Sequence, residues 1–229
     1  MFYLDPAYII VMIIGAIIAF SAQINVKTTF SKYSKKMSSR NISGQHVARL
    51  ILDNNGLNDI PIERIEGKLS DHYDPKKRVI RLSSVVYDSA SVASIGVAAH
   101  EAGHAIQHST HYAPLNFRNS IIPITNIGSN LAPFLIILGF LFNIYGLVLL
   151  GIFAFSLAVL FQLITLPVEF NASTRAVETL GNMNILDENE LIGTKKVLNA
   201  AAMTYVAALA VALLNLLYYI LRFSGRRSS

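Results

Sequence analysis

The sequence has no cysteine among its 229 residues. This absence excludes disulfide bonds and any metal site built from thiolates, although it identifies no cellular compartment. Charge is also scarce, since Asp, Glu, Lys and Arg make up 14% of the chain, against about 25% in an ordinary soluble domain. With 53% hydrophobic residues, the composition excludes a secreted mini-protein, a collagen-like chain and a disordered tail.

The scarcity of charge comes from three stretches that contain no Asp, Glu, Lys or Arg: 6–26, 119–168 and 197–221. The rest of the chain carries all the charge, at about the density of a soluble domain. A bilayer core is crossed by about 20 helical residues, so the first and last stretches each fit one span. The 50 residues of the middle stretch would reach about 75 Å as one helix. We therefore expect a hairpin of two spans there, interrupted near Asn143–Gly146.

The sequence thus predicts an α-helical membrane protein with four transmembrane helices, placed roughly at 6–26, 126–143, 146–168 and 197–221. The first span is interpreted as a retained anchor. A signal peptide begins with positively charged residues, whereas the residues before this span include no Lys or Arg. The predicted segments are an N-terminal anchor 1–26, a soluble segment 27–118, a transmembrane hairpin 119–168, a second soluble segment 169–196 and a C-terminal helix with a basic tail 197–229.

Lys and Arg close to the membrane predict the side on which a soluble segment lies. The two soluble segments hold most of these residues, including a cluster directly after the first span: Lys27, Lys32, Lys35, Lys36 and Arg40. We therefore expect a multi-pass protein of the cell membrane with both soluble segments in the cytoplasm, although the basic tail argues weakly against it. The cluster is interpreted as a topology signal, with the lipid bilayer as partner and no nucleic acid, because no motif of a nucleic-acid reader accompanies it.

The soluble segment 27–118 predicts a small α+β unit. Ser43 can cap a helix that ends at Gly56, and residues 60–65 alternate apolar and polar side chains, as a half-buried strand does. Asp74-Pro75 is a turn signal between two short runs, KLSDHY and the strand RVIRLS at 78–83, and it predicts a hairpin. A helix rich in alanine then begins near Asp88 or Ser89. We expect this unit to pack against the spans and against the segment after Val168.

The second helix carries the sequence His100-Glu101-Ala102-Gly103-His104, which is an HExxH pattern. Residues four apart lie on one face of a helix, so both imidazoles can converge on a single ion. Glu101 can reach a metal-bound water without being a ligand. The alternative, two histidines held by neighbours on an ordinary helix, is disfavoured because the pattern falls on a helix that follows a probable strand.

A catalytic zinc needs a third protein ligand and an open position for water. His108 is too far along the helix from His100 to share the ion, about 12 Å, and His111 lacks the spacing of an extended histidine motif. Glu169 is favoured, because it is the first charge after the long uncharged stretch and is expected on the same face of the membrane as the motif. Its alternative is an interfacial carboxylate at a helix end.

These residues predict a zinc-dependent endopeptidase. Bound zinc would activate a water and polarise the scissile carbonyl, and Glu101 would take the water's proton and deliver it to the leaving amine. The substrate would be a peptide or a membrane protein. We further expect the strand Arg78–Ser83 to offer its edge to an extended substrate.

The chain resembles the bacterial YugP-type membrane zinc metallopeptidases over nearly its full length. The resemblance is carried by MFYLDP, LSDHYDPKKRVIRLS, GVAAHEAGHAIQH, LPVEFNASTRA and KVLNAAAMTYVAAL. The arrangement is similar to that of the heat-shock protease HtpX and the CAAX prenyl proteases. The resemblance implies Glu169 as the third ligand and therefore a gluzincin-like metallopeptidase segment. Those families place an Asp four residues after this Glu, where Ser173 stands here, so Ser173 or Asn171 is expected to hold a motif histidine by a weaker hydrogen bond.

Two other classes of function compete with the enzyme. A membrane scaffold or regulator with a structural zinc site is the main alternative, and the presence of Glu101 disfavours it, since a structural site needs no general base. A transporter would carry charges within its spans, and these spans have none. Four further polar residues receive no assigned role: His46, His72, Arg175 and Tyr205.

Overall fold

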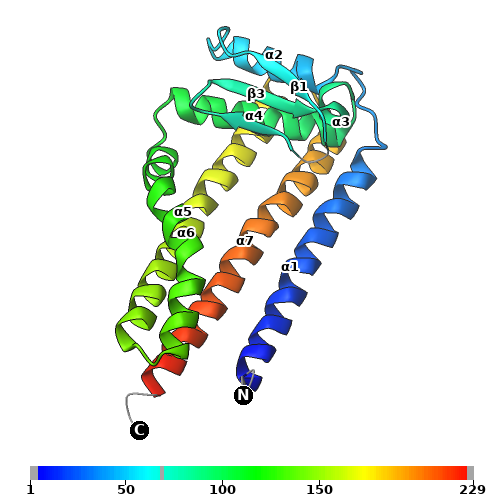
Figure 1. The fold of residues 1–229 in the computed structure, drawn as a ribbon. Coiled ribbons are helices and arrows are strands. Elements are labelled where there is room, and N and C mark those ends of the chain that lie inside the picture. The colour runs from blue at the N-terminus through cyan, green and yellow to red at the C-terminus, as the bar shows by residue number, and fades with distance from the viewer. Residues whose placement is uncertain (1–4, 68–69, 226–229) are drawn as a thin grey trace. The chain divides into compact units, whose positions relative to one another are not determined.

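The computed structural model describes residues 5–67 and 70–225. Its elements are α1 (Pro6–Tyr33), α2 (Gly44–Asn54), β1 (Ile62–Ile65), β2 (His72–Asp74), β3 (Val79–Ser83), α3 (Ser84–Tyr87), α4 (Val92–Ser109), α5 (Ala113–Leu141), α6 (Tyr145–Asn182) and α7 (Glu188–Gly225), as Figure 1 shows. The chain divides into two compact parts. The membrane part is Met1–Gln23, Asn116–Leu166 and Thr204–Ser229, and the sheet part is Ile24–Leu115 and Pro167–Met203.

Four helices of the described chain are long and apolar enough to cross a membrane: α1, α5, α6 and α7. The four predicted spans are confirmed, but the helices that contain them are longer. Helix α5 begins at Ala113 instead of near 126, and α6 continues past 168 to Asn182. The difference arises because absence of charge detects the apolar core of a span, whereas helical geometry continues into charged residues.

The predicted break in the long uncharged stretch is present. Helix α5 ends at Leu141 and α6 begins at Tyr145. Between them Asn143 has a positive φ of 54°, a left-handed conformation that asparagine tolerates and that ends a helix.

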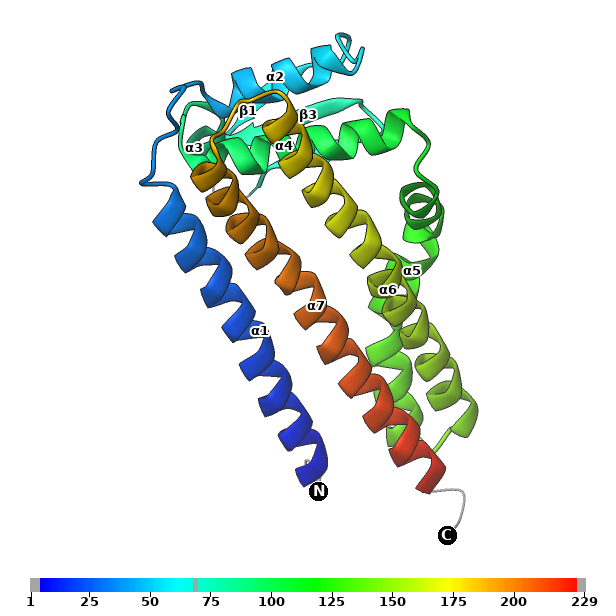
Figure 2. The ribbon, with the colours of Figure 1, turned by 180° about the vertical axis from the view of Figure 1, so that it is seen from behind.

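Small residues allow the helices of the membrane part to approach closely. A Cβ at Gly139 would lie 2.7 Å from the backbone nitrogen of Val148, and one at Gly15 would lie 3.3 Å from the Val211 side chain. The first contact joins α5 to α6 and the second joins α1 to α7, whose ribbons lie side by side in Figure 2. Close approach at small residues such as these glycines is common where helices pack in a bilayer.

The sheet of the sheet part has the strand order β1-β3-β2. Strand β3 pairs in parallel with β1 and antiparallel with β2, so the predicted hairpin around Asp74-Pro75 is confirmed. Because β3 is the central strand, both of its edges are already occupied. Our expectation that the strand 78–83 offers an edge to substrate is therefore wrong. In the described sheet, the free edges belong to β1 and β2.

One hydrophobic core holds the sheet part together. The inner residues of α2, the buried face of β3 and the small side chains of α4 meet there, together with side chains from α6 and α7. Ile80 and Leu82 of β3 and Ile51 of α2 are almost completely buried. The expected packing of this unit on the segment after Val168 is present, since Ala176 and Leu180 of α6 belong to the same core.

Candidate metal centre

Helix α4 presents the HExxH residues from a rigid position. Its first turn is capped by Ser91, whose hydroxyl oxygen accepts a hydrogen bond from the backbone nitrogen of Ser94, which satisfies one of the free amides at a helix start. The body of the helix is mostly alanine, glycine and small apolar residues, and most of it is buried. Such small side chains let neighbouring backbones come close to the motif.

The neighbour that comes closest is α6. A Cβ on Gly103 would lie 2.8 Å from the carbonyl oxygen of Ala172, a distance that real Cβ atoms do not tolerate. Glycine at the fourth position of the motif therefore permits the contact between the two helices. Because Glu169 lies about one helical turn before Ala172 on α6, this contact brings its carboxylate to the histidines.

The structure brings His100, His104 and Glu169 together, and each can offer one ligand atom within 4.8 Å of the others. Glu169 Oε2 lies 3.4 Å from His100 Nε2 and 3.7 Å from His104 Nε2. The two imidazole rings meet edge to face, with centroids 4.6 Å apart. All three side chains are largely buried, with 14%, 12% and 6% of their surface exposed.

These distances fit a tetrahedral metal ion. Nitrogen and oxygen ligands lie about 2.0–2.2 Å from zinc, so two of them at the tetrahedral angle are separated by about 3.3–3.6 Å. The two measured separations, 3.4 and 3.7 Å, match or slightly exceed this range. Two imidazoles and one carboxylate are also a known ligand set of catalytic zinc, in which a fourth position is left open.

Glu101 lies beside this cluster and is 7% exposed. In the described part of the chain its carboxylate has neither a hydrogen-bond nor an ion-pair partner, although its charge acts on His104. The Glu101 carboxylate is therefore not used to hold α4 against its neighbours.

Neutral groups hold the far sides of both imidazoles. Ser173 Oγ lies 3.1 Å from His100 Nδ1, and Gln107 Oε1 lies 3.0 Å from His104 Nδ1. The sequence identified Ser173 and Asn171 as candidates for such contacts. Ser173 makes such a contact. Asn171 contacts Gln107 instead, by accepting a hydrogen bond from its Nε2 at 2.9 Å. Gln107 was missed, because an amide one turn after a histidine is not distinctive in the sequence without its partners on α6.

The surroundings of His104 raise its pKa when no metal is bound. Burial lowers the pKa of His104, but contact with the Glu169 carboxylate and the charges of Glu101 and Glu169 raise it by more. The net pKa lies above the ordinary value of 6.5. The surplus of negative charge around His104 is what a cation in the site would neutralise.

His108 and His111 are not members of the metal cluster found among the described residues. His108 instead contacts the sheet, because its Nδ1 lies 2.8 Å from the hydroxyl of Tyr73 in β2. Burial lowers the pKa of His108, and the charges of Arg78 and His111 lower it further. A neutral imidazole can accept a hydrogen bond from the Tyr73 hydroxyl, so this contact attaches β2 to the last turn of α4.

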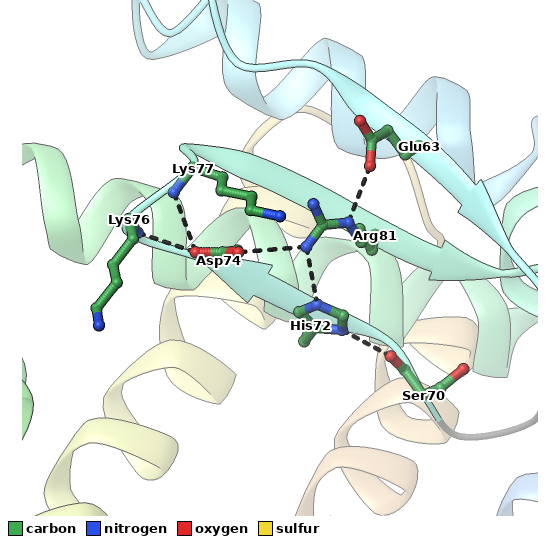
Figure 3. Close-up of polar contacts among 7 residues, drawn as sticks. All are labelled: Glu63, Ser70, His72, Asp74, Lys76, Lys77 and Arg81. Atoms are coloured by element: carbon green, nitrogen blue, oxygen red, sulfur yellow. Dashed lines mark hydrogen bonds and ion pairs between the residues drawn. The ribbon is translucent and has the colours of Figure 1, made fainter. Parts of the chain in front are cut away.

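His72 points away from α4. Side chains alternate along a strand, so His72 and Asp74 lie on the face of β2 opposite to Tyr73. Figure 3 shows His72 beside Arg81, with its Nε2 3.4 Å from the guanidinium nitrogen. The same guanidinium contacts Glu63 and Asp74. His72 thus belongs to a row of charged groups across the sheet and not to the metal cluster.

The remaining polar residues without an assigned role are not members of the metal cluster found among the described residues either. Arg175 donates from Nε to Asn171 Oδ1 at 2.8 Å. His46 is exposed on α2 and contacts Ser43 Oγ at 2.9 Å. Tyr205 lies in the stretch of α7 that belongs to the membrane part.

Comparisons with known proteins identify the class. Residues 8–224 match the family described as "Putative neutral zinc metallopeptidase", and the chain belongs to this family. It is 49% identical over 210 residues to the "Putative membrane protease YugP" of Bacillus subtilis (strain 168), covering 92% of this chain and 93% of that protein. No solved structure matches the chain. The protein is therefore a multi-pass membrane protein of a zinc metallopeptidase family.

Proposed function

We propose that this protein is a zinc-dependent endopeptidase in which His100, His104 and Glu169 hold the metal and Glu101 is the general base. The observation that carries the proposal is the meeting of three ligand atoms from two helices at separations that suit a tetrahedral ion. The family supports zinc as the metal.

The residues of the chain divide the chemistry between them. Bound zinc would lower the pKa of its water and polarise a peptide carbonyl. Glu101 accepts the proton of the attacking water and returns it to the leaving amine. Its burial at 7% exposure and its lack of a hydrogen-bond partner in the described chain leave both of its oxygens available for this transfer.

The edge of the sheet that can take up an extended substrate is β2. Strand β3 is paired on both sides, and β2 is fastened to the end of α4 through Tyr73 and His108. A peptide that added to β2 would form backbone hydrogen bonds with it while lying beside the helix that carries both histidines. The substrate class is therefore an extended peptide or an unfolded segment of a membrane protein.

The active site is proposed to face the cytoplasm. Five Lys and Arg follow the first span between residues 27 and 40, which favours a cytoplasmic location for the sheet part. The opposing charge on the tail is partly offset, because Arg222 Nε lies 3.2 Å from Asp5 Oδ2 in the membrane part.

The proposal is tested by assaying the detergent-purified protein for zinc content and for cleavage of labelled casein, beside Glu101→Gln. Glu101→Gln should retain zinc and lose cleavage by about 10²–10⁴-fold, the usual contribution of a general base. Glu188→Gln, an exposed change at the start of α7, is the matched control and should leave both unchanged.

Two results would decide against the enzyme. Equal cleavage by the wild type and Glu101→Gln would refute Glu101 as the base. Stoichiometric zinc with no cleavage of any peptide would favour the alternative, an inactive scaffold with a structural site.

A further inference from the structure

Gln107 is a completely buried polar side chain on α4 that lies outside the HExxH pattern. Its Oε1 is 3.0 Å from His104 Nδ1, and its Nε2 donates to the carbonyl oxygen of Val168 at 2.8 Å and to Asn171 Oδ1 at 2.9 Å. A carboxamide has two hydrogens to donate and one oxygen with two lone pairs to accept. These three contacts therefore use both hydrogens of Gln107 and one lone pair of its oxygen.

The partners determine which way the amide is turned. A backbone carbonyl accepts but cannot donate, so the Gln107 atom that faces Val168 must be the nitrogen. Asn171 agrees with this assignment, because its Oδ1 also accepts from the Nε of Arg175, a group that only donates. Oε1 of Gln107 consequently faces His104.

The orientation of Gln107 in turn fixes the tautomer of His104. An amide oxygen only accepts, so His104 Nδ1 must carry the proton. A neutral imidazole protonated at Nδ1 has a free lone pair at Nε2, the atom that lies 3.7 Å from Glu169 Oε2. Gln107 thereby selects the form of His104 that can bind a metal through Nε2.

His100 is held less strictly. Its Nδ1 contacts the hydroxyl of Ser173 at 3.1 Å, and a hydroxyl can either donate or accept. Ser173 therefore orients the ring without choosing its tautomer. The two histidines of the motif differ in how far the protein prepares them for a metal.

We infer that Gln107 is a positioning residue of the metal centre. It holds His104 in the metal-binding tautomer and connects the helix of both histidines to the backbone of Val168, directly before Glu169. One buried amide thus sets the proton position on one ligand and also joins the two helices that supply all three ligands. This inference rests on the proposed function, because it requires that the cluster binds a metal.

The test is the Zn²⁺ affinity of the full-length protein in detergent, measured by competition with a chromophoric chelator. Gln107→Leu removes all three contacts with little change in volume and should weaken Zn²⁺ binding by about 10–100-fold, the usual effect of losing such an outer partner. Ser173→Ala should weaken it less. Thr194→Val removes another buried hydroxyl, which donates to the carbonyl oxygen of Val92 on α4 at 3.5 Å, and should leave the affinity unchanged.

A spectroscopic readout separates positioning from a general loss of stability. Co²⁺ substituted for Zn²⁺ should give a visible absorption band whose position or intensity changes in Gln107→Leu and not in Thr194→Val. If Gln107→Leu does not fold, Gln107→Met, which has the same chain length, is expected to show the same two changes.

The outcomes are distinguishable from those of the proposed function. Wild-type affinity and an unchanged Co²⁺ spectrum in the Gln107 variants would overturn the inference while leaving a metalloenzyme intact. A wild-type protein that binds neither Zn²⁺ nor Co²⁺ would overturn both.

Discussion

Gly103 of α4 lies directly against the carbonyl oxygen of Ala172 in α6, so closely that a Cβ would be 2.8 Å from that oxygen. The contact is between backbones and therefore leaves no flexible side chain that could move aside. Since Gly103 stands between His100 and His104, and Ala172 stands about one turn after Glu169, the distance from the Glu169 carboxylate to the two histidines depends on this contact.

Gly103→Ala should push the two helices apart and weaken Zn²⁺ binding. Inserting a methyl group into a tight contact typically costs about 1–3 kcal/mol, so the thermal midpoint should fall as well. The matched control is Gly146→Ala at the start of α6, where a Cβ meets nothing within 4 Å. Zinc retention during gel filtration and thermal unfolding measure the two effects. Full zinc retention in Gly103→Ala would contradict the role of the contact.

Glu190 should stabilise the fold without affecting the metal. It is 3% exposed, and its carboxylate accepts hydrogen bonds from the backbone nitrogens of Ser39 at 2.6 Å and Asp187 at 3.0 Å. Glu190→Ala leaves both donors unpaired and should lower stability by about 1–3 kcal/mol. Glu188→Ala, an exposed change in the same turn, serves as control. Thermal unfolding of the zinc-loaded protein should show a lower midpoint for Glu190→Ala alone.

The stabilisation by Zn²⁺ should increase as the pH rises. The pKa of His104 in the metal-free protein is raised above its ordinary value, so this histidine stabilises the metal-free fold below about pH 6.5, and that contribution is lost as the pH rises through its folded pKa. Protons also compete with the metal for the imidazole. The gain in thermal midpoint on adding Zn²⁺ should therefore be smaller at pH 5.5 than at pH 8. A gain that does not vary with pH would contradict this.

Tyr73→Phe should impair cleavage while sparing the metal. The Tyr73 hydroxyl fastens β2 to His108, and neither residue is a member of the metal cluster. Losing one such hydrogen bond costs about 1 kcal/mol, and a loosened edge strand should lower kcat/KM for a peptide by several-fold. Zn²⁺ affinity should stay at the wild-type value. Tyr87→Phe on α3 offers a comparison outside β2, and equal effects of the two changes would argue against a role of β2 in binding.

The proposed orientation predicts where reporters should be active. Alkaline phosphatase fused after residue 229 should be active, because the C-terminus is expected outside, whereas the same enzyme inserted in the β2–β3 turn at Lys77 should be inactive. Green fluorescent protein at the same positions should give the opposite pattern. Active phosphatase at Lys77 would contradict the proposed cytoplasmic location of the sheet part and indicate the opposite orientation.

Much of the fold could be predicted because charge and apolar periodicity report directly on burial. The break at Asn143 and the hairpin at Asp74-Pro75 each carry a local turn signal. The position of β3 in the centre of the sheet could not be predicted, since its parallel pairing with β1 joins strands separated by β2 in the sequence. No local residue preference specifies such a pairing.

In the site, too, the features that are local in sequence could be predicted and those that depend on long-range contacts could not. The spacing of His100 and His104 is local to one helix, and Glu169 was marked by its place after an uncharged stretch. The contacts of Ser173 and Gln107 depend on how α6 lies against α4, which arises from tertiary packing. A glutamine one turn after a histidine has no distinctive pattern until its partners on the other helix are known.

The strand order also limits the directions open to a peptide that joins the sheet at β2. Strand β2 runs opposite to β1 and β3. A peptide paired antiparallel with β2 would therefore run the same way as β3, whereas a peptide paired in parallel would run the opposite way. The pairing mode at this one edge thus fixes the direction of the substrate chain before any side chain is recognised.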